Sequence, residues 1–123
     1  MNRHEFRKLL ERMAAGWNSG DAAIVADCFA ERVSYVDPVR YSFRVRHDLL
    51  KFFELPEGQS QCVIWHRVLF DEAEQTGAAE YTYEGHKRYH GAVIVKVEDG
   101  RITRWREWQH ISELDWEAFV GDG

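Results

Sequence analysis

The second half of the chain, from Gln61 to Ile111, is a nearly unbroken succession of alternating apolar and polar residues. This period-two pattern is typical of β-strands that bury one face. Short polar or glycine-containing turns divide the stretch into four strands, over residues 61–70, 79–84, 89–97 and 101–111. Glu98-Asp99-Gly100 is the strongest of these hairpin signals. Four long consecutive strands joined by short turns predict a β-meander.

The first part of the chain has helical spacing instead. One apolar stripe recurs every three to four residues and predicts a helix that ends at Gly16-Gly20; it comprises Phe6, Leu9, Leu10, Met13 and Trp17. A second helix, capped by Ser19 or Asp21, buries Ile24, Val25, Cys28 and Phe29. A third, short helix is predicted over residues 47–55, and a short C-terminal helix over about 112–120.

The remaining segments are less regular. Residues 31–36 alternate and predict the first strand, whereas residues 41–45 alternate but can also form a loop. The C-terminal Gly121-Asp122-Gly123 is expected to fray. Three helices followed by long strands predict an α+β fold in which a curved antiparallel sheet wraps the helices, and the length suggests one domain over residues 1–123.

Composition excludes several function classes. The net charge of −5 argues against nucleic-acid binding, and no apolar run of about 18 residues is present to span a membrane. The N-terminus lacks an apolar signal core, so we expect a cytoplasmic protein, with Cys28 and Cys62 as reduced, buried residues. The histidines lack metal-ligand spacing and there is no glycine-rich phosphate loop, so we expect no metal and no cofactor.

One short stretch carries candidate chemistry: Ser34 to Arg40, at the end of the first strand. Tyr35 and Asp37 are two residues apart and face the same side of an extended chain. Pro38 ends the strand, because it has no N–H to donate. Asp37 can therefore be a catalytic base at the edge of a pocket, or a turn acid that accepts backbone hydrogen bonds, and the Asp-Pro pair by itself favours the turn.

The order of elements resembles the nuclear transport factor 2-like superfamily, and within it the SnoaL-like polyketide cyclase group. The segments that carry the resemblance are Trp17-Asp21, Phe29-Pro38 and Asp99-Trp108. The resemblance implies a cone-shaped fold that encloses one pocket, often in a dimer packed through the sheet. It specifies activity poorly, because the superfamily includes isomerases, dehydratases, epoxide hydrolases and members without catalysis.

Ketosteroid isomerase is one relative that can be compared residue by residue. Asp37-Pro38 stands where the isomerase has its general base. The two oxyanion donors of the isomerase are replaced here by Met13 and by Val93 or Ile94. Steroid isomerisation by that mechanism is therefore not expected.

Limonene epoxide hydrolase is the second relative. In Trp105-Arg106-Glu107-Trp108, Glu107 matches the residue that activates water, and Tyr35 matches a tyrosine that holds the water. Asp37 replaces the asparagine that also holds it. The Arg and Asp that protonate the epoxide have no counterpart near Tyr81, so only half of that site is matched.

These comparisons predict a pocket that binds a small apolar ligand. The predicted catalytic residues are Asp37, Glu107, Tyr35 and His66, and the predicted ligand contacts are Trp17, Met13, Tyr81, Val93 and Trp105. Two facing carboxylates would have separated pKa values, which suits hydrolysis, dehydration, isomerisation or cyclisation. Two alternatives stay open: Glu107 as a salt-bridge partner and His66 as a structural histidine, within a non-catalytic binding or association module.

The opposite face of the last strand has a different character. It presents Arg104, Arg106, Trp108 and His110, which suit a protein interface better than a solvated face. We therefore expect a homodimer packed through the sheet. His90 is expected on this outer face as well.

Overall fold

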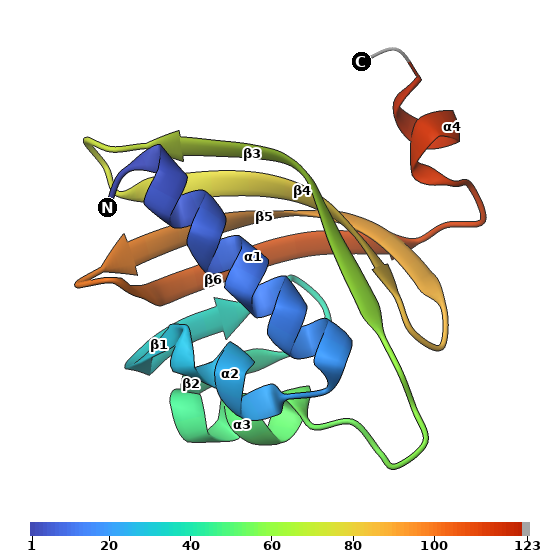
Figure 1. Cartoon of the computed structure of the whole chain (residues 1–123), viewed down its shortest axis with the longest axis horizontal. Coiled ribbons are helices and arrows are strands. Elements are labelled where there is room, and N and C mark those ends of the chain that lie inside the picture. The colour runs from blue at the N-terminus through green and yellow to red at the C-terminus, as the bar shows by residue number, and fades with distance from the viewer. Residues whose placement is uncertain (122–123) are drawn as a thin grey trace.

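The computed structural model describes residues 1–121 (Figure 1). The helices in that range are α1 (Arg3–Ser19), α2 (Ala22–Asp27), α3 (Arg46–Phe53) and α4 (Trp116–Val120). The strands are β1 (Phe29–Val36), β2 (Ser42–Val45), β3 (Cys62–Asp71), β4 (Thr76–Glu84), β5 (Arg88–Glu98) and β6 (Arg101–Ile111). Asp122 and Gly123, on which the predicted fraying falls, lie outside the described residues.

All six strands form one sheet in the order β2-β1-β6-β5-β4-β3. The predicted meander is confirmed, because β3 to β6 are antiparallel neighbours. The prediction of a wholly antiparallel sheet is wrong, because β1 pairs with β6 in parallel. The chain leaves β1, passes through β2 and α3 to the far edge of the sheet and returns strand by strand, so β6 arrives beside β1 in the same direction. The ambiguous segment 41–45 contributes the edge strand β2.

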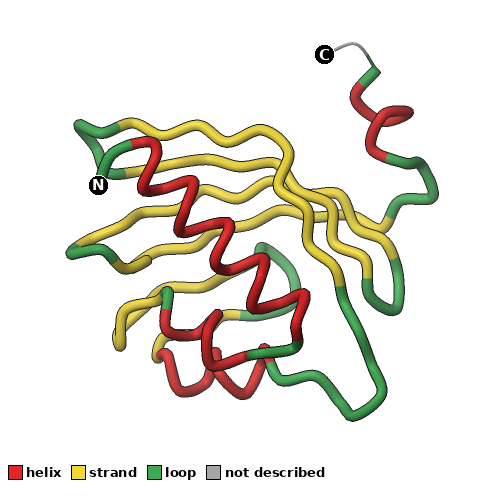
Figure 2. Tube along the Cα trace, viewed as in Figure 1, coloured by secondary structure: helices red, strands yellow, loops and turns green. Residues whose placement is uncertain are grey.

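Helices α1, α2 and α3 lie on one side of this sheet (Figures 1 and 2). α1 crosses the strands, and α2 and α3 lie beside β1 and β2. The Asn2 side chain and Glu5 form a capping box that begins α1, and Gly20 ends it at φ 75°, a left-handed conformation that glycine adopts without strain. The predicted stripe is confirmed, since all five of its residues are buried.

Side-chain hydrogen bonds attach α1 to the edge strand β3. The Trp65 indole donates to the carbonyl of Leu10 at 2.7 Å. The Asn18 amide accepts from the Val63 backbone N–H at 2.7 Å and donates to its carbonyl at 3.3 Å. These contacts hold the middle and the C-terminal end of α1 against β3.

A β-bulge in β3 changes which side chains face the helices. The register between β3 and β4 shifts between Trp65 and Val68. Val63 and Val68 are both buried, although a regular strand would place them on opposite faces. The prediction that His66 shares a face with Val68 is therefore wrong. Cys62 is exposed rather than buried, because it alternates with the inward-facing Val63.

The outer face of the sheet is partly covered by α4 and the segment before it. His66 stacks on Trp116 with ring centroids 3.9 Å apart, and His90 stacks on Phe119 at 5.5 Å. The Thr82 hydroxyl lies between the two histidines, 2.7 Å from His66 Nε2 and 2.9 Å from His90 Nδ1. His90 Nε2 lies 2.7 Å from the carbonyl of Leu114. The outer-face prediction for His90 is confirmed.

Thr82 is expected to hold α4 on the sheet. A carbonyl can only accept, so His90 Nε2 carries the proton and His90 Nδ1 accepts from Thr82. Replacing Thr82 with valine leaves two ring nitrogens without a partner, which should lower the free energy of unfolding by about 1–3 kcal/mol. Urea denaturation measures this change. Thr103→Val is the matched control, because the Thr103 hydroxyl makes only a 3.5 Å contact; equal losses in both variants would contradict the prediction.

Candidate functional site

A cavity of about 500 Å³ lies on the concave side of the sheet. It is bounded by the end of α1, the β1–β2 loop, α3 and strands β3 to β6. Half of its wall is aromatic: Trp17, Tyr35, Tyr41, Phe52, Phe53, Trp65, Tyr81, Tyr83, Tyr89 and Trp105. The rest is Arg40, Leu55, Gln59, Gln61, Val63, His86, Lys87, Glu107, Gln109 and Ile111. An apolar wall with a few converging polar groups is the usual character of a small-molecule site.

A larger groove of about 760 Å³ lies over α2 and α3 and is less suited to chemistry. Of its two acids, Asp27 is already bound by Arg12 at 2.9 Å and by Arg101 at 3.3 Å, and Glu31 is exposed to solvent. We therefore place the candidate site in the aromatic cavity.

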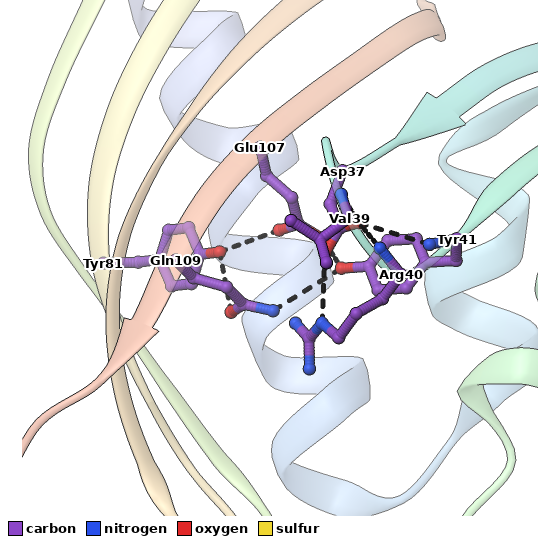
Figure 3. A network of polar contacts seen from close by, with 7 residues as sticks. All are labelled: Asp37, Val39, Arg40, Tyr41, Tyr81, Glu107 and Gln109. Carbon is purple, nitrogen blue, oxygen red and sulfur yellow. Dashed lines mark hydrogen bonds and ion pairs between the residues drawn. The ribbon is translucent and has the colours of Figure 1, made fainter.

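Glu107 is the single carboxyl group that lines this cavity, and its side chain is at the centre of a polar network (Figure 3). It comes from β6 and is 4% exposed. The Tyr41 hydroxyl donates to its Oε1, and the Tyr81 hydroxyl lies 2.8 Å from its Oε2. Gln109 closes the network, with Oε1 3.0 Å from the Tyr81 hydroxyl and Nε2 3.5 Å from the Tyr41 hydroxyl.

Burial makes this carboxyl harder to ionise. Loss of solvent raises the pKa of Glu107 above its ordinary value, because the ionised form is poorly solvated there. Contacts from Tyr41, Tyr81, Trp105 and Tyr35 act in the opposite direction but do not cancel the effect of burial. The Trp105 indole N–H is buried and has no hydrogen-bond partner among residues 1–121. The site therefore surrounds one acid with several neutral donors.

The tyrosines around Glu107 keep their protons. Burial, and next the proximity of Glu107, raise the pKa of Tyr41, of Tyr81 and of Tyr35 above the ordinary value. Each phenol is therefore a hydrogen-bond donor over the whole physiological pH range.

A glycine on β5 allows Tyr81 to reach this network. Gly91 pairs with Tyr81 across β4 and β5. A Cβ atom at Gly91 would lie 2.7 Å from the Tyr81 ring and 2.8 Å from the carbonyl of Trp108. The missing side chain thus lets the phenol lie against the strand and point at Glu107.

Five of the predicted site residues line the cavity. Tyr35 and Trp105 stack in parallel with centroids 5.5 Å apart, and Trp17 packs edge-on against Trp105 at 6.1 Å. Tyr81 and Glu107 form the hydrogen bond described above. The structure thus brings together one predicted carboxyl with its predicted aromatic surroundings.

Asp37 does not join them, which corrects its predicted placement. Its Oδ1 accepts from the backbone N–H groups of Val39, Arg40 and Tyr41, and its Oδ2 pairs with Arg40 Nε at 3.1 Å. Burial raises the pKa of Asp37, but the hydrogen bonds from Arg40, Val39 and Tyr41 outweigh it and lower the pKa overall. Asp37 is a turn acid, ionised and outside the cavity lining, so a two-carboxylate mechanism with Glu107 has no geometric basis.

Three further predicted positions also need correction. His66 lies on the outer face under α4, because the β3 bulge turns it away from the cavity. Met13 and Val93 are fully buried in the core and do not line the cavity.

Tyr41 and Gln109 were not predicted as site residues. Gln109 follows Glu107 by two positions and shares its strand face, so strand parity could have indicated it. Tyr41 lies in a loop whose conformation depends on Asp37, and its sequence carries no such signal. Among the described residues, no group of three or more His, Cys, Asp or Glu side chains could hold a metal ion. None of the described helices is long and apolar enough to cross a membrane.

Comparison with known protein families assigns the chain to a family. The model of the SnoaL-like domain matches residues 10–105. The chain belongs to this family. No curated protein matches this chain.

Solved structures with the same fold show how widely it is used. An LEH-like epoxide hydrolase from M. tuberculosis is 18% identical, with a TM-score of 0.75 over 88% of the SnoaL-like domain and 84% of that chain. A nuclear transport factor 2-like protein of unknown function from Cytophaga hutchinsonii is 12% identical, with a TM-score of 0.71 over 85% and 88%.

A third structure has a bound small molecule. It is a protein of ketosteroid isomerase-like fold from Catenulispora acidiphila in complex with trimethylamine, 15% identical, with a TM-score of 0.72 over 82% of the SnoaL-like domain and 84% of that chain. At these identities the likeness shows the fold alone. The predicted α+β fold is thereby confirmed, and the match to the SnoaL-like domain over residues 10–105 confirms the predicted family.

Proposed function

We propose that the cavity binds a small, largely apolar molecule and that Glu107 transfers a proton to or from an oxygen-bearing group of that molecule. The observation that supports this proposal is a buried carboxyl group with a raised pKa inside an aromatic cavity. A carboxyl with a raised pKa keeps its proton to a higher pH and can act as a general acid.

Counting hydrogens around Glu107 supports the neutral form. The ring of contacts Tyr41–Glu107–Tyr81–Gln109–Tyr41 contains four contacts and needs four hydrogens. The hydroxyls of Tyr41 and Tyr81 and one N–H of the Gln109 amide supply three hydrogens. Turning the amide over exchanges its oxygen and nitrogen but does not change this number. A protonated Glu107 supplies the fourth, so every contact becomes a hydrogen bond. The ring can run in either direction, and both directions keep Glu107 neutral.

The proposed chemistry follows from this donor. Glu107 gives its proton to a carbonyl or epoxide oxygen of the ligand, and Tyr41 and Tyr81 then donate to the carboxylate that remains. The carboxylate recovers a proton from a neighbouring carbon or from water. Isomerisation, dehydration, cyclisation and epoxide opening all contain such a step, and the M. tuberculosis neighbour is an epoxide hydrolase by its description.

A second candidate is binding without catalysis. It is favoured by the closed ring around Glu107, because all of its hydrogen bonds are made within the protein. In that case the carboxyl would only fix the tyrosines that shape the cavity. Binding of ligand would then occur without any change to the ligand.

Fluorescence and turnover separate the two candidates. Phenylnaphthylamine, an apolar dye, should gain fluorescence on binding and receive excitation energy from Trp17, Trp65 and Trp105 in the wall. Catalysis should appear as opening of styrene oxide or as deuterium uptake next to the carbonyl of tetralone. Dye binding without either reaction would favour the non-catalytic candidate. Absence of dye binding would contradict a ligand-binding cavity.

We also propose that the protein forms a homodimer through the outer face of the sheet. Arg104, Arg106 and Trp108 are exposed there, and the Arg106 guanidinium lies 5.7 Å from the Trp108 ring. Exposed Trp and Arg are typical of interface centres. Sedimentation should give twice the monomer mass for wild type and the monomer mass for Trp108→Glu. A monomeric wild type at micromolar concentration would contradict the dimer.

A further inference from the structure

We infer that the mouth of the cavity, formed by Arg40 and Lys87, binds an anionic oxygen group at one end of the ligand. This inference rests on the proposed function and adds a substrate class to it: a small apolar acid rather than a neutral molecule. It is carried by the geometry of the 37–41 loop and by the distribution of charge around the cavity.

The loop holds Arg40 at the mouth. Asp37 accepts three backbone N–H groups through Oδ1, so the turn is closed whatever the Arg40 side chain does. Its second oxygen then engages Arg40 Nε at 3.1 Å. Asp37 is 5% exposed in its side chain, whereas Arg40 is 45% exposed. The acid is therefore a positioning residue and the arginine remains accessible.

Two aromatic rings complete the support of Arg40. Its guanidinium carbon lies 5.5 Å from the centroid of Tyr41 and 5.5 Å from that of Tyr89. Both are within the range of cation–π attraction. Among residues 1–121 the terminal Nη1 and Nη2 atoms have no hydrogen-bond partner. An arginine with a fixed orientation and a free pair of N–H groups is suited to bind a carboxylate through two parallel hydrogen bonds.

The charges around the cavity have the opposite sign to the charge of the chain. The whole chain carries −5. The cavity lining contains two permanent cations, Arg40 and Lys87, and one acid, Glu107, whose ring of four contacts with Tyr41, Tyr81 and Gln109 is complete when the carboxyl is neutral. Asp37 compensates one of the two cations, so one positive charge remains at the mouth. This field attracts an anionic ligand group and leaves the aromatic interior for its apolar part.

Tyr41 connects the mouth with the interior. Its hydroxyl donates to Glu107 and its ring supports Arg40, so both polar groups are built on one side chain. A ligand anchored by its acid at Arg40 would extend its apolar body along the aromatic wall toward Glu107. The distance between anchor and proton donor would then select ligands by length.

Two dyes that differ by one sulfonate test this inference. Anilinonaphthalenesulfonate has the anionic group, and phenylnaphthylamine is the same molecule without it. Wild type should bind the sulfonate more tightly. Arg40→Gln should weaken sulfonate binding by about tenfold to a hundredfold and leave phenylnaphthylamine binding unchanged. Arg40→Lys should recover part of the loss, because it keeps the charge but not the pair of parallel donors.

Arg7→Gln is the matched control, because it removes the same charge from an exposed position of α1 that does not line the cavity. It should change the binding of neither dye. Equal binding of both dyes by wild type, or equal weakening in Arg40→Gln and Arg7→Gln, would overturn the anionic mouth while leaving the cavity proposal intact. Failure of both dyes to bind would overturn the cavity proposal and this inference together.

Discussion

Replacing Glu107 with glutamine is expected to slow proton transfer by about 10²–10⁴-fold while ligand binding persists. Glutamine has nearly the same shape as the neutral acid and can complete the hydrogen-bond ring with Tyr41 and Tyr81. It cannot release a proton to the ligand. The loss should therefore appear in the turnover rate of styrene oxide or tetralone, and the affinity for phenylnaphthylamine should stay within about twofold, as expected for a change confined to the reacting step.

Glu80→Gln is the matched control for this substitution, because Glu80 lies on the opposite face of β4 from Tyr81. Its turnover should equal that of wild type. If Glu107→Gln retains wild-type turnover, Glu107 does not transfer the proton, and its role is limited to shaping the binding cavity.

The pH dependence of stability gives a readout that needs no substrate. The folded protein holds the Glu107 proton to a higher pH than the unfolded chain, because burial raises the pKa. Between the two pKa values the folded state binds more protons, so the contribution of Glu107 to stability is present at low pH and is lost as pH rises through the folded pKa. Glu107→Gln should lack this dependence in urea denaturation series.

Replacing Trp105 with alanine is expected to lower the free energy of unfolding by about 3–5 kcal/mol. Trp105 is 1% exposed and its ring contacts Trp17, Phe29, Tyr35 and Trp65. Removing it joins the core to the ligand cavity and leaves four aromatic side chains without their common neighbour. Since domains of this kind are stable by only about 5–15 kcal/mol, the variant should be close to unfolding.

Trp108→Ala is the control, because Trp108 lies three positions further along β6 and is 43% exposed. Urea denaturation followed by circular dichroism measures both variants. At a protein concentration at which wild type and both variants are monomeric, Trp108→Ala should lose less than about 1 kcal/mol, as expected for a surface change. Equal losses in the two tryptophan variants would contradict the assignment of Trp105 to the centre of the core.

Much of the fold follows from local patterns in the sequence. The stripe from Phe6 to Trp17 specifies the buried face of α1, and the period-two pattern specifies the meander from β3 to β6. These patterns are informative because a regular helix or strand repeats its orientation at a constant interval. The β3 bulge breaks that interval between Trp65 and Val68, so His66 neither shares a face with Val68 nor lines the cavity. Its contacts with Thr82 and Trp116 agree instead with the alternative of a structural histidine.

The candidate site was only partly predictable. Strand parity placed Glu107, Tyr81 and Trp105 on faces that the fold turns inward. Tyr35 and Asp37 would face the same side if β1 continued as a regular strand. The chain turns after β1, and the Asp37 carboxylate accepts hydrogen bonds from the backbone N–H groups of Val39 and Tyr41. The local preference of the Asp-Pro pair for a turn was the better guide. The resemblance to ketosteroid isomerase favoured a base at position 37. A resemblance in sequence does not show the backbone N–H groups that bind the Asp37 carboxylate.

By itself, therefore, the sequence determined the helices, the strands of the meander and the residues available for chemistry, because these depend on neighbours close in the chain. Only the tertiary structure decided which of those residues meet. Tyr41 reaches Glu107 across 66 positions and Tyr81 reaches it across 26. The raised pKa of Glu107 arises from that assembled environment, since burial and hydrogen-bond donors are supplied by segments that no local pattern connects.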